Sequence, residues 1–150
     1  MRREVTMIAG AAPWLTWALL SATFAALTAV CAKVGVDGVD PDLATLFRTI
    51  VIGVVLTALL AGTGKFDRVG AIALRTWVFL VLSGLATGAS WLCYFRALKV
   101  GDAARVAPVD KLSVVLVAVL GATLLGEHLS LRGWTGVALI GAGAVCVALG

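Results

Sequence analysis

Residues 77–98 read WVFLVLSGLATGASWLCYFRAL and carry a single charged side chain, Arg96. A helix that spans a membrane needs roughly 20 mostly apolar residues, because the hydrocarbon core is about 30 Å thick and a helix rises about 1.5 Å per residue. This stretch meets both requirements. It therefore predicts a transmembrane helix.

Four other apolar stretches have a similar length, and polar segments rich in Gly, Asp and Pro separate them. The fourth is the weakest by hydropathy, because its uncharged part begins only at Leu112. We predict an all-α integral membrane protein with five transmembrane helices in one domain, residues 1–150. The predicted helices cover residues 14–33, 43–62, 77–98, 104–125 and 133–149.

Composition excludes several classes of protein. The chain is 61% hydrophobic and 13% charged, with a mean hydropathy of +1.08, which is outside the range of water-soluble domains. Its net charge of +4 is scattered among short connections, so we expect no nucleic-acid partner. No catalytic motif, metal-ligand spacing or phosphate-binding loop occurs, so we expect no enzyme, no cofactor and no metal. The three cysteines are expected to act as small apolar packing residues: Cys31, Cys93 and Cys146.

The distribution of Lys and Arg leaves the orientation of the chain open. Assigning the twelve cations to the two sides gives six on each, so the positive-inside rule selects neither orientation. If Arg48 and Lys111 lie within helices, the count becomes six to four and favours a cytoplasmic N-terminus. Dual insertion, with copies facing both ways, fits the balanced count. The N-terminal side holds Arg2, Arg3, Lys65, Arg68, Arg75 and Arg132, and the other side holds Lys33, Arg48, Arg96, Lys99, Arg105 and Lys111.

Small residues at helical spacing predict close helix packing. Helices in lipid associate through small residues that let their backbones approach. These seams fit either packing within one chain or the interface of a homodimer. They are formed by Gly84 with Gly88, by Ser21, Ala25 and Ala29, and by Gly141, Ala142, Gly143 and Cys146.

Three charged residues inside predicted helices are the candidates for function. A charge at the centre of a spanning helix costs about 2.5–3.5 kcal/mol on insertion scales. Arg48, Asp110 and Lys111 enter from the same side, so they are expected to converge. Adjacent residues point about 100° apart on a helix, so we expect Asp110 to pair with Arg48 and leave Lys111 for a substrate anion or a loop. The alternative is that Arg48 and Lys111 snorkel to the interface.

Two further features lie close to these charges. Pro108 either interrupts its helix, as in transporter substrate sites, or is a plain first-turn proline. Trp91 lies too deep for an interfacial tryptophan, and it either packs over the Gly84 and Gly88 seam or lines a substrate cavity with Tyr94. We predict a substrate-binding site formed by Arg48, Trp91, Tyr94, Asp110 and Lys111.

The second half of the chain carries, in order, YFRAL at 94–98, VAP at 106–108, DKLS at 110–113, LGE at 125–127 and a Gly-rich segment at 136–143. This order of motifs resembles the EamA-type family of the drug/metabolite transporter superfamily. The resemblance covers nearly the whole chain, from Trp14 to Leu149. Members commonly have ten helices as two fused five-helix repeats of opposite orientation, and this chain is similar to the short class with one repeat.

The resemblance implies a multi-pass transporter of the plasma (inner) membrane. One repeat cannot enclose a central cavity, so a second copy in the opposite orientation is the expected partner, besides the lipid bilayer. The substrate would be a small polar metabolite, anionic or zwitterionic, moved by alternating access, with Asp110 as the candidate proton-coupling group. The alternatives are a non-transporting membrane subunit, a partner in the translocation of a lipid-linked sugar, and a small multidrug exporter.

Overall fold

The structure is a computed structural model that describes residues 13–66, 70 and 72–150. These residues form no strand. The α5 and α6 helices together make one interrupted span, so five segments are long and apolar enough to cross a membrane. The prediction of an all-α membrane protein with five transmembrane helices is confirmed. The helices are α2 (Pro13–Gly35), α3 (Pro41–Gly62), α4 (Leu74–Val100), α5 (Ala103–Asp110), α6 (Ser113–Leu124) and α7 (Leu131–Leu149).

The observed helices begin one to three residues before the predicted starts, and polar side chains cap two of them, α3 and α7. The Asp40 carboxylate accepts hydrogen bonds from the backbone N–H groups of Asp42 and Leu43 at 2.9 and 3.2 Å, which caps α3. The Ser130 hydroxyl accepts from the N–H of Gly133 at 3.2 Å and caps α7. Hydropathy alone does not detect such caps.

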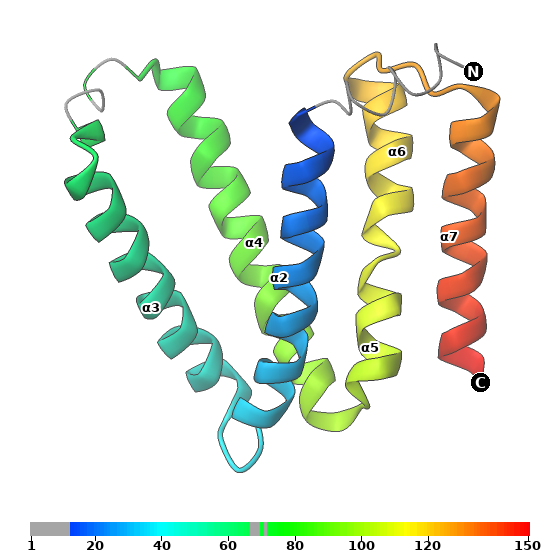
Figure 1. The fold of residues 1–150 in the computed structure, drawn as a ribbon, viewed down its shortest axis with the longest axis horizontal. Coiled ribbons are helices and arrows are strands. Elements are labelled where there is room, and N and C mark those ends of the chain that lie inside the picture. The colour runs from blue at the N-terminus through cyan, green and yellow to red at the C-terminus, as the bar shows by residue number, and fades with distance from the viewer. Residues whose placement is uncertain (1–12, 67–69, 71) are drawn as a thin grey trace, which may run out of the picture.

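Successive spans run in opposite directions (Figure 1), and they meet most closely at one end of the bundle. We call it the joined end: α2 and α4 finish there, and α3 and α5 begin. The described residues reach this end in segments 33–45 and 95–106. Toward the opposite end, α3 and α4 diverge from the group formed by α2, α6 and α7 (Figure 1).

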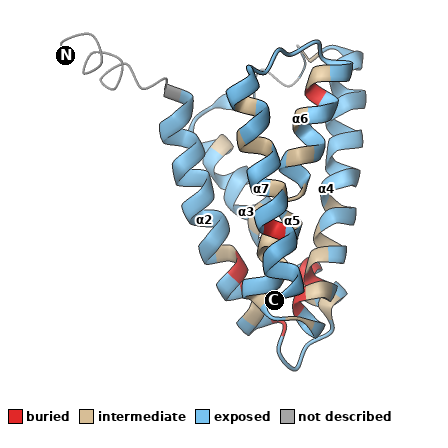
Figure 2. Ribbon diagram, turned by 90° about the vertical axis from the view of Figure 1, so that its right-hand side faces the viewer, coloured by how far each residue is buried: buried red, intermediate tan, exposed pale blue. Residues whose placement is uncertain are grey.

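The small hydrophobic core lies at the joined end (Figure 2). It consists of Ala32, Val36, Phe95 and Leu98, with Val36 and Leu98 almost fully buried. The other buried positions are isolated, such as Gly121 near the end of α6 and Ala144 in α7. The core therefore fixes one end of the bundle and leaves most of each helix uncovered.

Two lysines at the joined end each bond to backbone carbonyls near the end of the other lysine's helix. Lys33, in the last turn of α2, donates to the carbonyls of Leu98 and Gly101 at 2.8 Å each. Lys99, in the last turn of α4, donates to the carbonyls of Val36 and Val39 at 2.9 and 3.0 Å. The last carbonyls of a helix lack partners within it and carry negative partial charge. Lys33 thus caps the end of α4, and Lys99 holds the turn that follows α2. We call the pair the lysine clamp.

Most of the apolar surface of the spans is not covered by protein. Only 6–11% of the residues in the membrane-spanning windows are buried, and large side chains such as Phe24, Phe47 and Leu85 are more than half exposed. Apolar surface of this extent is stable against lipid tails, which are as apolar as leucine. The helices therefore face lipid or a partner chain over most of their length.

The fourth span is interrupted at Lys111 and Leu112, between α5 and α6. Pro108 lies inside α5 and has no N–H to donate to the carbonyl of Ala104, four residues earlier. Three residues later the backbone tightens: the N–H of Lys111 bonds to Pro108 O at 3.1 Å, and that of Leu112 to Val109 O at 3.0 Å. The prediction of one continuous helix from 104 to 125 is wrong at this point. The reading of Pro108 as a plain first-turn proline is also wrong.

The described cations lie at the two ends as the helix directions require. The joined end holds Lys33, Arg96, Lys99 and Arg105, and the opposite end holds Lys65, Arg75 and Arg132. Arg48 and Lys111, the other two cations counted on the joined side, lie within the spans. Arg2, Arg3 and Arg68, which complete the count on the opposite side, lie outside the described residues.

Candidate functional site

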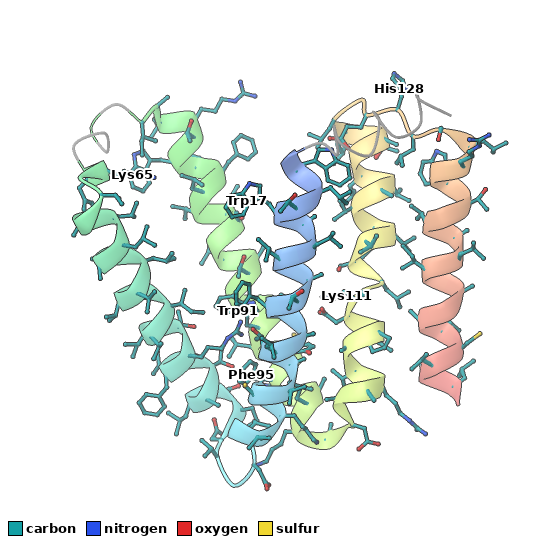
Figure 3. All side chains as sticks on the ribbon, viewed as in Figure 1. Trp17, Lys65, Trp91, Phe95, Lys111 and His128 are labelled. Atoms are coloured by element: carbon teal, nitrogen blue, oxygen red, sulfur yellow. The ribbon has the colours of Figure 1, made fainter. Side chains whose placement is uncertain are left out.

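The guanidinium group of Arg48 stacks on an aromatic side chain of the neighbouring helix. Its Cζ atom lies 4.2 Å from the centre of the Trp91 ring and 5.4 Å from that of Phe95, both on α4. Trp91 and Phe95 lie on successive turns of α4 (Figure 3). A guanidinium over an indole face is attracted by the ring's negative face and contributes about 0.5–2 kcal/mol.

The contact between Arg48 and Trp91 argues against the snorkelling alternative. Arg48 and Trp91 lie about 5–6 Å from the midpoints of α3 and α4, at a rise of about 1.5 Å per residue. A snorkelling arginine would extend to the helix end, whereas the guanidinium of Arg48 stays over Trp91 and is partly buried. Arg48 is therefore held as a cation within the spanning region.

Asp110 pairs with Lys111 and not with Arg48. Lys111 Nζ lies 3.1 Å from Asp110 Oδ2. The predicted pairing with Arg48 assumed a continuous helix, on which neighbouring side chains diverge by about 100°. Because α5 ends at Asp110, Lys111 lies in the break, and its long side chain reaches back to the carboxylate. The expected Asp110–Arg48 pair is therefore wrong, and the structure pairs the two neighbours.

All five residues predicted to bind substrate nevertheless line one cavity. Its volume is about 190 Å³, and its walls come from α2, α3, α4 and the break after α5. The structure thus brings together side chains separated by more than 60 positions in the sequence. What binds to them stays a prediction. The lining residues are Ala25, Thr28, Arg48, Ser90, Trp91, Tyr94, Asp110 and Lys111.

Three of the lining residues were not predicted: Ala25, Thr28 and Ser90. Hydroxyl side chains are common in membrane helices, where they usually bond to their own backbone, as Thr49 does to the carbonyl of Thr45 at 2.8 Å. Hydropathy therefore does not distinguish Thr28 from such residues. Its position could have indicated Thr28, because it lies one turn from Ala25, a member of the small-residue stripe of α2.

Two larger cavities adjoin this one and share residues with it. A cavity of about 610 Å³ between α2, α3 and α4 includes Arg48 and Thr28, and its other walls are mostly apolar, with Phe24, Phe47 and Phe95. A cavity of about 380 Å³ between α4, α5 and α7 is lined in part by Ser90, Tyr94 and Asp110. The polar site therefore lies between two partly apolar spaces.

The glycines of α4 do not pack within the chain. A Cβ atom added to Gly84 or Gly88 would meet no atom within 4 Å. The interpretation that Trp91 packs over these glycines is wrong, because Trp91 lies against Arg48. By contrast, a Cβ on Gly141 of α7 would lie 3.3 Å from Val115 of α6, so that seam joins helices of one chain.

The three cysteines are exposed and do not have the packing role expected of them. Cys31 lines the 610 Å³ cavity and Cys93 the 380 Å³ cavity. Among the described residues, no group of three or more His, Cys, Asp or Glu side chains is arranged to hold a metal ion.

Five apolar spans, the fourth of them interrupted, with a charged and aromatic cavity near mid-span, are an arrangement typical of membrane transporters. The chain belongs to the EamA-like transporter family, which it matches over residues 12–149. The resemblance stated from the sequence motifs is confirmed. A protein of Sinorhizobium sp, named an uncharacterized transporter in the cobO 3′ region, is 62% identical over 136 residues. That match covers 91% of this chain and 96% of the relative. No solved structure matches the chain at a significant level.

Proposed function

We propose that the chain acts as an antiparallel homodimer that moves a small polar metabolite across the plasma (inner) membrane by alternating access. The observation that carries the proposal is a polar cavity near mid-span in a bundle whose helices are mostly uncovered. Arg48, Trp91 and Asp110 line it, while most of the surrounding helix surface is uncovered. A second copy covers this surface.

An inverted second copy supports transport better than a parallel one. Transporters commonly place their substrate between two repeats of opposite orientation. Because a repeat with five spans crosses the membrane an odd number of times, the two ends of the repeat lie on opposite sides. In an antiparallel pair, each copy contributes one Arg48 site about 5–6 Å from mid-span, on opposite sides of the midplane. A substrate can then pass from one site to its symmetry mate as the two halves rock. The balanced charge of the two sides permits both insertions.

The exposed glycines of α4 mark the proposed contact between copies. Gly84 and Gly88 have no neighbour within the chain at the Cβ position, and small residues four apart permit close approach of two helices. Together with Leu80 and Leu92 they form one stripe at four-residue spacing. The relative supports the single-repeat architecture, because a match over 96% of its length leaves no room for a second repeat.

Disulfide cross-linking along α4 tests this arrangement. In a cysteine-free protein, an antiparallel contact centred between Gly84 and Gly88 places position 80 of one copy opposite position 92 of the other. Co-expressed Leu80→Cys and Leu92→Cys chains should therefore form a mixed dimer on oxidation, and neither should link to itself. Leu82→Cys, on another face of α4, is the matched control and should not link. Self-linking at both positions would show a parallel pair and contradict the proposal.

Transport is tested with the purified protein in vesicles. Currents on a solid-supported membrane would be recorded for a panel of small organic anions, zwitterions and neutral analogues. We expect signals for one charged class, lost in Arg48→Gln and kept in the matched Lys65→Gln. No signal for any compound would favour the non-transporting subunit. A small multidrug exporter is disfavoured because lipophilic cations would meet a cavity with two cations and one carboxylate.

A further inference from the structure

We propose that the cavity selects small organic monocarboxylates, and that Arg48 receives their carboxylate group. This inference rests on the transport function proposed above and names its substrate class. It depends on three observations: the free donors of Arg48, the charge of the cavity, and the apolar space beside it.

Arg48 is the exception among the described cations on its side of the membrane. Each of the others donates to an oxygen of the protein, whereas Arg48 makes no hydrogen bond or ion pair within the part of the chain that the structure describes. Arg48 also lies within the span α3, where it borders a mostly apolar cavity. The paired cations are Lys33 with Leu98 and Gly101, Arg96 with Asp42, Lys99 with Val36 and Val39, Arg105 with Gly150, and Lys111 with Asp110.

Stacking on Trp91 orients these free donors. A guanidinium has five N–H groups, all in the plane of the group. The centre of the Trp91 ring lies 4.2 Å from Cζ, and none of the N–H groups has an oxygen partner among the described residues. Two parallel N–H groups of a guanidinium match the two oxygens of a carboxylate. The stack therefore fixes a fork-shaped anion receptor without neutralising it.

The charge of the cavity favours an anion over a zwitterion or a cation. Asp110 is the one carboxylate that lines the cavity among the described residues, and it is engaged by Lys111 at 3.1 Å. The pair is neutral, so Arg48 leaves the cavity with a net charge of +1. A substrate ammonium group would have to displace Lys111 from Asp110, whereas a carboxylate meets Arg48 directly. A monoanion balances the site.

The surroundings limit the size and shape of the substrate. The hydroxyls of Thr28, Ser90 and Tyr94 face the same 190 Å³ cavity and make no hydrogen bond within the described residues. These hydroxyls can donate further hydrogen bonds to the oxygens of a carboxylate, or bond to a single polar substituent of the substrate. Arg48 and Thr28 also border the 610 Å³ cavity, whose walls are mostly apolar. The substrate is therefore a small carboxylate with an apolar or aromatic body.

The fluorescence of Trp91 provides a direct test in neutral detergent micelles. Trp14, Trp17, Trp77 and Trp134 lie outside the cavity lining and would be replaced by Phe, which leaves Trp91 as the one tryptophan. The probes are benzoate, the neutral benzamide and the cationic benzylamine. We expect a saturable change with benzoate and none with the other two. Arg48→Gln should weaken benzoate binding at least tenfold, and the matched Lys65→Gln should leave it unchanged.

The outcomes separate this inference from the proposed function. Equal responses to benzoate and benzamide, or unchanged benzoate binding in Arg48→Gln, would overturn it. A response to phosphatidylglycerol but not to benzoate would also overturn it, because Arg48 would then hold a lipid headgroup. If Arg48→Gln fails to fold, Arg48→Lys, which keeps the charge but loses the planar fork, should bind benzoate more weakly. Binding in micelles requires neither transport nor dual insertion, so a failure of carboxylate recognition and a failure of the proposed transport can be told apart.

Discussion

Replacing Lys33 by methionine tests how the lysine clamp holds the joined end. The substitution keeps an unbranched side chain but removes two hydrogen bonds of 2.8 Å, to the carbonyls of Leu98 and Gly101. A hydrogen bond to a charged group contributes about 1.5–3 kcal/mol net. The two bonds share one ammonium group, and interfacial water can partly replace them. We therefore expect the free energy of unfolding to fall by about 2 kcal/mol, about 30-fold in the equilibrium constant.

The assay is reversible unfolding in mixed micelles with increasing SDS, followed by far-ultraviolet circular dichroism. Lys99→Met, which removes bonds of 2.9 and 3.0 Å to Val36 and Val39, should cost a similar amount. The double variant should lose less than the sum, because both lysines stabilise one junction and such neighbours are not additive. Lys65→Met is the matched control at the opposite end of the bundle.

Two results would refute the reasoning about the clamp. One is a free energy of unfolding for Lys33→Met that lies within about 0.5 kcal/mol of the value for Lys65→Met, which is the range of ordinary surface substitutions. The other is strict additivity of Lys33→Met and Lys99→Met, which would mean that the two lysines act independently and do not form one clamp.

Three further predictions concern the contact between copies, a turn and the cavity. Gly84→Leu should lower the cross-linked dimer fraction at least tenfold by blocking close approach of α4 helices, whereas Leu85→Ala should not; equal dimer fractions would contradict this. Gly126 has a φ of 67°, so Gly126→Ala should lower the free energy of unfolding by about 1–2 kcal/mol, while Gly62→Ala, inside a helix, should not lower it. Asp110→Asn should abolish transport driven by a pH gradient at unchanged protein level; unaffected transport would exclude Asp110 as the coupling group.

The sequence predicts the spans well because each is long, apolar and separated by polar residues. The positions of the charges along these spans also indicate which residues share a cavity, since Arg48, Asp110 and Lys111 enter their helices from the same side. These arguments depend only on helix rise and direction. They do not require knowledge of how neighbouring helices pack.

The partners of those charges could not be predicted, because they depend on local departures from a regular helix. The break at Lys111 lets that lysine reach Asp110, and a pairing with Arg48 fails for this reason. Lys33 and Lys99 were counted only as loop charges, although a lysine in the last turn of a helix is placed to bond to terminal carbonyls. The carbonyls that they bind lie at the end of a different helix or in the turn after it, which only the packing reveals.

The orientation of the C-terminus tests the central claim, the antiparallel homodimer, most directly. One reporter active only in the cytoplasm and one active only outside it would be fused separately to Gly150. The account predicts that both fusions are active at comparable levels, because copies insert both ways. Activity of one fusion alone would contradict it, since all copies would then face the same way and no antiparallel pair of this chain could form.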